Sequence, residues 1–309
     1  MSFSDDIFKS NDVKRAMSIP LPIVALESTV LTHGLPRPQN LQLARDMERA
    51  VREEGATPAT IAFVDSYLHI GLTDAELERL ATDKEAFKVA PRDFAVFSIY
   101  DANGGTTVAG TMLACKHAGI KVFATGGIGG VHRETPFDIS ADLQALATIP
   151  MIVVCAGAKA ILDLPATLEY LETMSVPVVG YGTDEFPAFF SRDSGLDVTI
   201  NLDTPEDIVT FAKAHWDAGL QSAVLVANPV PEAEAIPSSV MEPFIKQANK
   251  EALEKDIHGK ELTPFLLQRI TELTKGKSMR ANLSLLLNNA RLAAKIARAL
   301  RNIEKRKLG

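Results

Sequence analysis

The sequence predicts an α/β protein of the α/β/α layered kind, in which helices cover both faces of a largely parallel central sheet and a C-terminal helical annex follows. Three observations predict this fold. Six short apolar runs alternate with amphipathic stretches, which is typical of strands buried in a parallel sheet. The 309 residues are 46% hydrophobic, which suffices for one large core. Strand-like runs no longer occur in the last part of the chain.

The six apolar runs are expected to form the strands of the central sheet. Both faces of a parallel sheet are buried, so its strands read as continuous apolar runs instead of alternating patterns. In such sheets ligands bind where strands end and loops begin, so functional residues are expected just after these runs. In chain order the predicted strands are residues 22–26, 59–64, 121–125, 151–157, 176–181 and 222–229.

Helices are predicted between the strands. Residues 41–51 place apolar side chains at helical spacing, and the pattern ends at Gly55. A second helix is expected to begin at Thr73, which can form a capping box with Glu76. The Thr204–Pro205 pair is a start signal for a third helix.

The same patterns predict the domain organisation. Residues 1–21 are interpreted as an N-terminal extension and residues 22–309 as one domain, whose helical annex begins at about residue 238. No linker rich in glycine, serine or proline separates the annex, so we expect it to pack on the same domain. The last helix is basic. The helix dipole explains cations at its C-terminal end better than a membrane surface or a helix-binding partner does.

Charge and cysteine content exclude several classes of protein. With 32 basic and 39 acidic residues the net charge is −7, which argues against a broad nucleic-acid-binding face. The two cysteines, Cys115 and Cys155, exclude a disulfide framework or a cysteine zinc site and favour a reducing compartment. The first residues contain no apolar signal segment, and no run of about 18 apolar residues follows. A soluble, cytoplasmic protein is therefore expected.

Two ionisable residues stand where buried strands are predicted to end. Glu27 follows the run 22–26, where desolvation would raise the pKa of its carboxyl toward the range useful for acid–base catalysis. From position alone, a structural role is equally well supported, in which the Glu27 carboxylate accepts hydrogen bonds from backbone amides of the next loop. Lys159 follows the run 151–157 and precedes a helical pattern, surroundings that disfavour its charged form and suit attack on a carbonyl. From position alone, a lysine that reaches solvent from a strand end explains Lys159 better.

Two glycine-rich segments are candidates for anion binding. Residues 126–130 follow a predicted strand and include Gly126, Gly127, Gly129 and Gly130, whose missing side chains expose backbone amides. Residues 103–107 open a predicted helix, whose N-terminus could hold a phosphate. Neither segment matches the Walker or dinucleotide-binding pattern, which removes support for nucleoside triphosphates and NAD. Tight turns explain each glycine cluster equally well.

Further polar residues could complete a site. Asp138 and Asp142 are four positions apart, so at the start of a helix both carboxylates would face one side and could hold a hydrated hard cation. Position alone favours the alternative, in which Asp138 caps the helix. Lys88 and Arg92 form a short basic stretch that could pair with a phosphate or carboxylate, although solvent exposure is the default for such a lysine. His33 lies in a turn-rich loop that could reach the same pocket.

The sequence resembles the pseudouridine-5'-phosphate glycosidase family. The matching motifs occur in the family's order between about Ile23 and Ala297, which is far more specific than one glycine loop. They are ALEST, HGLPRPQN, GATPATIA, NGGTTVAGTM, VFATGGIGGVHR, FDISADLQ, VVCAGAK, PAFF, VANPVPE and GKELTPFLL. The resemblance implies an α/β/α fold assembled as a homotrimer. It also implies an Mn2+-dependent, reversible cleavage of pseudouridine 5'-phosphate by water to uracil and ribose 5-phosphate.

The resemblance implies roles for individual residues. Glu27 matches the family's proton donor, Lys159 its lysine nucleophile and Asp138 its metal ligand. A lysine suits this reaction because base and sugar are joined carbon to carbon: no heteroatom leaves, and an imine would provide an electron sink. The other matches are substrate-contacting or polar pocket positions, namely Lys88, Val108, Thr125, His132, Ser140, Ala141, Asp142 and Asn282.

Two segments depart from the family pattern. Residues 134–136 are shorter than the usual family segment, so the entry to the metal site is expected to differ. Residues 65–67 stand where the family usually carries glycine, so altered loop contacts are expected there. Two alternatives to the glycosidase stay open. One is another Schiff-base phosphosugar lyase, and the other is a non-catalytic phosphosugar-binding protein in which Lys159 and Glu27 are structural.

Overall fold

The computed structural model describes residues 7–133 and 138–308, and its largest element is a central sheet of eleven strands. The strands are β1 (Ile7–Lys9), β2 (Ile23–Leu26), β3 (Thr57–Val64), β4 (Tyr67–Ile70), β5 (Phe87–Val89), β6 (Gly104–Thr106), β7 (Val122–Ala124), β9 (Ile152–Cys155), β11 (Val178–Tyr181), β12 (Ile200–Leu202) and β13 (Val224–Ala227). Their spatial order is β1-β4-β3-β2-β7-β9-β13-β11-β12, and β6 joins β3 to β5. Two further strands, β8 (Val131–His132) and β10 (Leu162–Asp163), form a separate antiparallel pair.

The central sheet is mostly parallel. From β3 through β2, β7, β9, β13 and β11 to β12 every neighbouring pair is parallel, whereas β4 and β6 run antiparallel to β3. The carboxyl ends of the parallel strands therefore meet at one edge of the sheet. All six predicted strands are confirmed, as β2, β3, β7, β9, β11 and β13.

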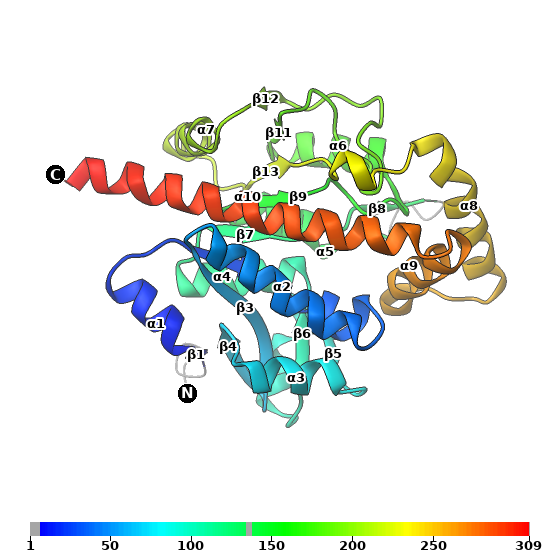
Figure 1. The fold of residues 1–309 in the computed structure, drawn as a ribbon, viewed down its shortest axis with the longest axis horizontal. Coiled ribbons are helices and arrows are strands. Elements are labelled where there is room, and N and C mark those ends of the chain that lie inside the picture. Colours follow the sequence, from blue (N-terminus) through cyan, green and yellow to red (C-terminus); the bar gives the residue numbers. More distant parts are fainter. Residues whose placement is uncertain (1–6, 134–137, 309) are drawn as a thin grey trace.

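Helices cover both faces of the sheet. They are α1 (Asn11–Ser18), α2 (Gln39–Glu53), α3 (Asp74–Thr82), α4 (Val108–Ala118), α5 (Ala141–Thr148), α6 (Leu164–Thr173), α7 (Pro205–Asp217), α8 (Ser238–Glu254), α9 (Leu262–Leu273) and α10 (Lys277–Leu308). On one face α10 lies between α2 and α7 and contacts three strands, while α4 and α5 pack together on the other (Figure 1). The predicted capping box of Thr73 with Glu76 and the N-cap at Thr204 are confirmed.

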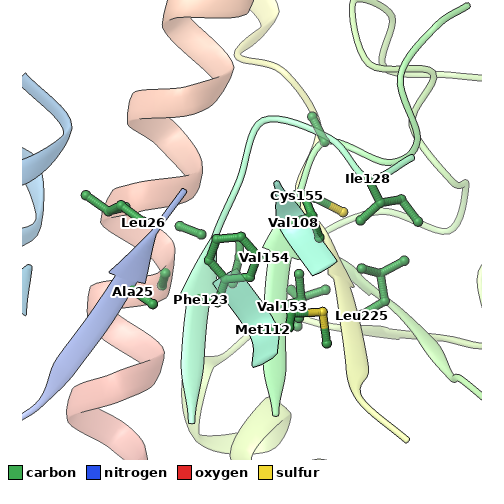
Figure 2. Packing of buried hydrophobic residues seen from close by; sticks show 14 of the residues in the cluster. Ala25, Leu26, Val108, Met112, Phe123, Ile128, Val153, Val154, Cys155 and Leu225 are labelled. Atoms are coloured by element: carbon green, nitrogen blue, oxygen red, sulfur yellow. The ribbon is translucent and has the colours of Figure 1, made fainter. Parts of the chain in front are cut away.

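The hydrophobic core lies between the sheet and the two helix layers. Figure 2 shows Phe123 of β7 among side chains of the neighbouring strands and of α4. Phe123, Val153, Leu225 and Met112 are each fully buried, so β7, β9, β13 and α4 share one core. Fully burying side chains of this size contributes about 1.5–3 kcal/mol each. The edge of the sheet that carries the strand ends is thereby rigidly supported.

The terminal segments are built into this fold. Strand β1 pairs in parallel with β4, and α1 buries Val13 and Ala16, so residues 7–18 extend the sheet and its helix layer. At the other end of the chain α8 and α9 pack on each other, and α10 spans the sheet (Figure 1). The helical annex therefore supplies a layer of the main domain. None of the described helices is both long and apolar enough to span a bilayer.

The hairpin between β3 and β4 contains the second departure from the family pattern. Asp65 and Ser66 both have positive φ angles, 47° and 72°, which favour glycine. Hydrogen bonds compensate the strain: the Ser66 hydroxyl donates to the Tyr100 oxygen at 2.8 Å and accepts from the Ala102 amide at 3.1 Å. The first departure, residues 134–136, lies outside the described residues. The hairpin does not line the cavity described next.

Candidate active site

A cavity of about 710 Å³ opens at the carboxyl edge of the parallel strands. Its wall combines residues that follow β2 and β9, the N-terminus of α4, the glycine loop after β7 and the first half of α10. Ten of the sequence-predicted site residues line it: Glu27, Lys88, Val108, His132, Asp138, Ser140, Ala141, Asp142, Lys159 and Asn282. The eleventh, Thr125, is fully buried and contacts one of them, as described below.

Glu27 occupies the position directly after β2, half-buried in the cavity wall. Burial raises the pKa of its carboxyl above the ordinary value of 4.5, and a weaker effect of Asp142 acts in the same direction. Lys159, the hydrogen bond from the Thr125 hydroxyl and Lys88 lower the pKa, but burial outweighs them. A carboxyl with a raised pKa that shares a cavity with an amine is suited to proton transfer.

Lys159 lies in the loop after β9, half-buried and facing the same cavity. Its amide donates to the Ile128 oxygen at 3.0 Å, and its own oxygen accepts from the Leu162 amide at 3.0 Å. The prediction of a helix directly after Lys159 is wrong, because α6 begins only at Leu164. The residues between form a turn and strand β10, whose pairing with β8 replaces the first helical turn.

Arg133 braces the loop that carries Lys159. Its guanidinium donates to the Leu162 oxygen at 3.1 Å and to the Ala160 oxygen at 3.2 Å, and it pairs with Glu242 of α8 at 2.9 Å. These two oxygens flank Lys159 on its C-terminal side. An arginine that binds two backbone oxygens and a carboxylate restricts the loop and therefore the reach of the lysine amine.

The two aspartates of the FDISAD motif have different surroundings. Asp142 is buried, and its carboxylate accepts from the Ala109 amide at 2.9 Å and from the Gly129 amide at 2.8 Å. Asp138 precedes α5, whose N-cap is Ser140. The predicted carboxylate pair on one helix face is therefore wrong, and so is the capping role of Asp138. Asp142 instead ties α5 to α4 and to the glycine loop.

The glycines of both candidate loops are required by close packing. A Cβ at Gly127 would lie 2.7 Å from the ring of Phe189, and one at Gly129 would lie 2.6 Å from the Cβ of Ser140. A Cβ at Gly105 would lie 2.8 Å from the Ser28 oxygen. These contacts leave no room for a side chain. The N-terminus of α4 nevertheless faces the cavity, since Thr107 and Val108 line it, so an anion could bind there.

Cationic and imidazole side chains lie elsewhere on the cavity wall. Lys88 of β5, Arg92 and His33 all line it. His33 belongs to a π-helical turn, residues 30–34, and its Nδ1 lies 2.7 Å from the Thr32 hydroxyl. His132 of β8 has a pKa below its ordinary value, chiefly because of burial, with Lys159 acting in the same direction and Asp138 opposing it. His132 is therefore suited to act as a neutral hydrogen-bonding group.

A metal ion would find few protein ligands in this cavity. No cluster of three or more histidine, cysteine, aspartate or glutamate side chains suitable for a metal occurs in residues 7–133 and 138–308. Asp138 is half-buried and lines the cavity, so it could hold an ion that keeps most of its water ligands. Hard divalent cations are commonly bound in this way, through one or two carboxylates.

Phe189 is a cavity residue that residue-level reasoning missed. Its backbone has a φ of 61°, which is strained for a bulky residue, and its buried ring contacts the Phe190 ring at 4.7 Å between centroids. The ring also forms the cavity wall beside Gly127. The available signal was its position in the PAFF motif, which marks a matched segment but gives no side-chain role.

The fold and the cavity define an α/β enzyme in which a lysine and a buried carboxyl share one site at the carboxyl edge of a parallel sheet. Residues 12–299 match the family model described as Indigoidine synthase A like protein. The chain therefore belongs to the indigoidine synthase A-like family, which includes pseudouridine-5'-phosphate glycosidases. The family resemblance predicted from the motifs is confirmed.

Relatives in this family are similar over nearly their full length. The pseudouridine-5'-phosphate glycosidase of Caldanaerobacter subterraneus subsp. tengcongensis is 52% identical over 298 residues, which cover 96% of this chain and 97% of the relative. The one from Solibacter usitatus is 53% identical, over 93% of this chain and 96% of the relative.

Two solved structures have the same fold. An indigoidine synthase A-like protein from Thermotoga maritima superposes with a TM-score of 0.87 at 35% identity, covering 96% of both chains. The prealnumycin C-glycosynthase AlnA, in complex with ribulose 5-phosphate, gives a TM-score of 0.89 at 37% identity and covers 97% of this chain and 98% of its own.

Proposed function

We propose that this chain is a pseudouridine-5'-phosphate glycosidase, which reversibly cleaves pseudouridine 5'-phosphate with water to uracil and ribose 5-phosphate. Relatives that carry this name are about half identical over nearly the whole chain. The observation that carries the proposal is the shared cavity of Lys159 and Glu27, since cleavage of a carbon–carbon glycosidic bond needs both an electron sink and a proton carrier.

In the proposed mechanism Lys159 acts as a covalent nucleophile. Its uncharged amine attacks C1' while the C1'–O4' bond breaks. Glu27 gives its proton to O4' and takes up one proton from the attacking nitrogen, so the ribose ring opens and a neutral secondary amine joins Lys159 to C1'. The nitrogen lone pair then forms an imine as the bond from C1' to uracil C5 breaks, and C5 takes up a proton. Water hydrolyses the imine, which releases ribose 5-phosphate and the amine. Glu27 carries protons to O4' and to C5.

The remaining cavity residues are proposed to bind substrate. Lys88 offers positive charge to the phosphate, and the backbone amide of Val108 at the N-terminus of α4 offers a hydrogen-bond donor. Ser140 and Ala141 lie at the start of α5, where the ribose hydroxyls would reach them. The polar groups proposed to orient the substrate are those of Thr125, His132, Asp142 and Asn282.

Asp138 is proposed to hold a single Mn2+ ion together with water molecules. When bound, such an ion would supply positive charge that polarises an oxygen and organises the pocket. We further propose a cytoplasmic homotrimer, in which residues 22–309 form the catalytic domain and residues 1–21 its N-terminal extension.

Release of uracil tests the proposed function. Purified protein with Mn2+ is expected to release uracil from pseudouridine 5'-phosphate, but not from uridine 5'-phosphate, and only weakly from unphosphorylated pseudouridine. If pseudouridine 5'-phosphate gives no uracil, the proposal that the chain is a glycosidase is wrong. A different Schiff-base lyase would then still form a borohydride-reduced adduct with ribose 5-phosphate on Lys159, whereas a non-catalytic binding protein would not. The matched control is Lys159→Arg, which keeps the charge but cannot form the adduct.

A further inference from the structure

Two buried asparagine side chains connect α10 to the ends of three strands behind the cavity. Asn289 of α10 is fully buried, and its Nδ2 donates to the Thr125 oxygen, just after β7, at 2.8 Å. Its Oδ1 accepts from Nδ2 of Asn228, just after β13, at 2.9 Å. The backbone amide of Asn228 in turn donates to the backbone oxygen of Cys155 in β9 at 2.8 Å. These hydrogen bonds join three neighbouring strand ends to one helix.

The orientation of the Asn289 amide follows from its partners. A backbone oxygen only accepts, so the side-chain nitrogen must face Thr125, and the side-chain oxygen then faces the amino group of Asn228. Helix and loop are in close contact here, because a Cβ at Gly126 would lie 3.0 Å from Leu286. Asn289 is fully buried and Asn228 is 5% exposed, so a lost partner would leave a buried polar group unpaired.

Asn289 does not line the cavity, so it can affect chemistry only through the residues it bonds; in the loop after β7 these are Thr125, the closer at 2.8 Å, and Gly126, the more distant at 3.5 Å. The Thr125 amide donates to the Val154 oxygen at 3.0 Å, so both backbone groups of Thr125 are held. A threonine on a fixed backbone has few χ1 rotamers, which limits the directions open to its hydroxyl. That hydroxyl donates to the Glu27 carboxylate.

We infer that Asn289, supported by Asn228, is a positioning residue that holds the Thr125 hydroxyl on Glu27 and thereby controls the proton carrier of the reaction. The inference rests on the proposed role of Glu27. The charged groups that act on Glu27 are Lys159, Asp142 and Lys88. The hydrogen bonds of the Asn289 side chain go instead to Asn228, Thr125 and Gly126. A hydroxyl that donates to a carboxylate favours its ionised form, so loss of this bond raises the pKa of Glu27 further.

The test uses Asn289→Leu, Thr125→Val and the double variant, with Asn288→Leu as the matched control. Asn288 is the neighbouring residue of the same type, and its side chain bonds the Pro229 oxygen at 3.3 Å instead of Thr125. The first measurement is a ¹³C-carboxyl NMR titration of Glu27 in the full-length protein, assigned with Glu27→Gln. This titration reports the carboxyl whether or not the protein releases uracil. The second measurement is kcat for uracil release.

The expected result is that Asn289→Leu and Thr125→Val each raise the pKa of Glu27 and lower kcat by about tenfold. The double variant should be no worse than Thr125→Val alone, because both changes remove one interaction. Asn288→Leu should leave both quantities unchanged. A titration of Glu27 that Asn289→Leu does not move, or additive losses in the double variant, would overturn the inference.

Failure of the proposed function gives a different outcome, in which no variant releases uracil but the Glu27 titration still responds. If Asn289→Leu does not fold, Asn228→Ala decides the question, since it removes the support of Asn289 and leaves α10 intact. Asn228→Ala is then expected to shift the Glu27 titration in the same direction, and its double variant with Thr125→Val to show no additional loss. An unshifted titration would refute the inference.

Discussion

Replacing Asp142 should destabilise the junction between α4, α5 and the glycine loop, and this loss of stability should not depend on a bound metal ion. Its buried carboxylate accepts two backbone amides, from Ala109 and from Gly129, and an alanine there leaves both N–H groups without a partner. An unsatisfied buried donor costs about 1–3 kcal/mol, so Asp142→Ala should lower the free energy of unfolding by about 4 kcal/mol. Asp142→Asn keeps one acceptor and should lower it by about 2 kcal/mol.

The assay is urea unfolding followed by circular dichroism, with and without Mn2+. Asp163→Ala is the matched control, because the Asp163 carboxylate accepts a single amide, that of Ala166 at 3.0 Å, at the start of α6. Loss of such an N-cap costs about 1 kcal/mol. The reasoning is refuted if Asp142→Ala is no more destabilising than this control, or if its destabilisation occurs only with Mn2+, as expected of a metal ligand.

Three further predictions concern the cavity. Gly127→Ala should push the Phe189 ring into the cavity, because the new Cβ would lie 2.7 Å from the ring. As a result kcat/KM for uracil release should fall, and the free energy of unfolding should fall by about 1–3 kcal/mol. Gly119→Ala has no close neighbour but a φ of 75°, so it should cost about 1 kcal/mol and leave kcat/KM unchanged. Burial raises the pKa of Glu27, and kcat/KM should decrease as pH rises through that pKa because the proton donor ionises. The pH-rate profile of Glu27→Gln should lack this decrease. After metal has been removed with a chelator, Asp138→Asn should need more added Mn2+ than the unchanged protein to restore half-maximal turnover. An unchanged Mn2+ requirement would exclude Asp138 as the ligand.

The central parallel strands could be predicted from the sequence, but strands such as β6 and β10 could not. Strands such as β9 are buried on both faces and therefore read as continuous apolar runs. Strand β6 consists of Gly104, Gly105 and Thr106, a composition that disfavours strands, and it forms because β3 and β5 pair with it. Tertiary pairing overrode local propensity at that position. The same competition explains β10, where pairing with β8 replaced the predicted start of a helix.

Strand ends indicated Glu27 and Lys159 and the family resemblance indicated most of the other residues that line the cavity, but hydrogen-bond partners could not be predicted. The spacing of Asp138 and Asp142 suggested a shared helix face, since nothing in the local sequence shows that amides of α4 and the glycine loop would bind Asp142. Asn289 was missed for a similar reason. A signal was present: Asn289 lies on the apolar face of the last helix, in register with the buried Leu285 and Leu292, where a polar residue needs a partner.

The place of α10 in the chain has a consequence for biosynthesis. This helix follows every other described strand and helix in the sequence, yet Asn282 lines the cavity and Asn289 holds the loop behind it. A ribosome delivers Lys159 and Glu27 long before it delivers these two residues. Until α10 emerges, the face of the sheet between α2 and α7 lacks this helix, so we expect the pocket to assemble only once α10 has been made.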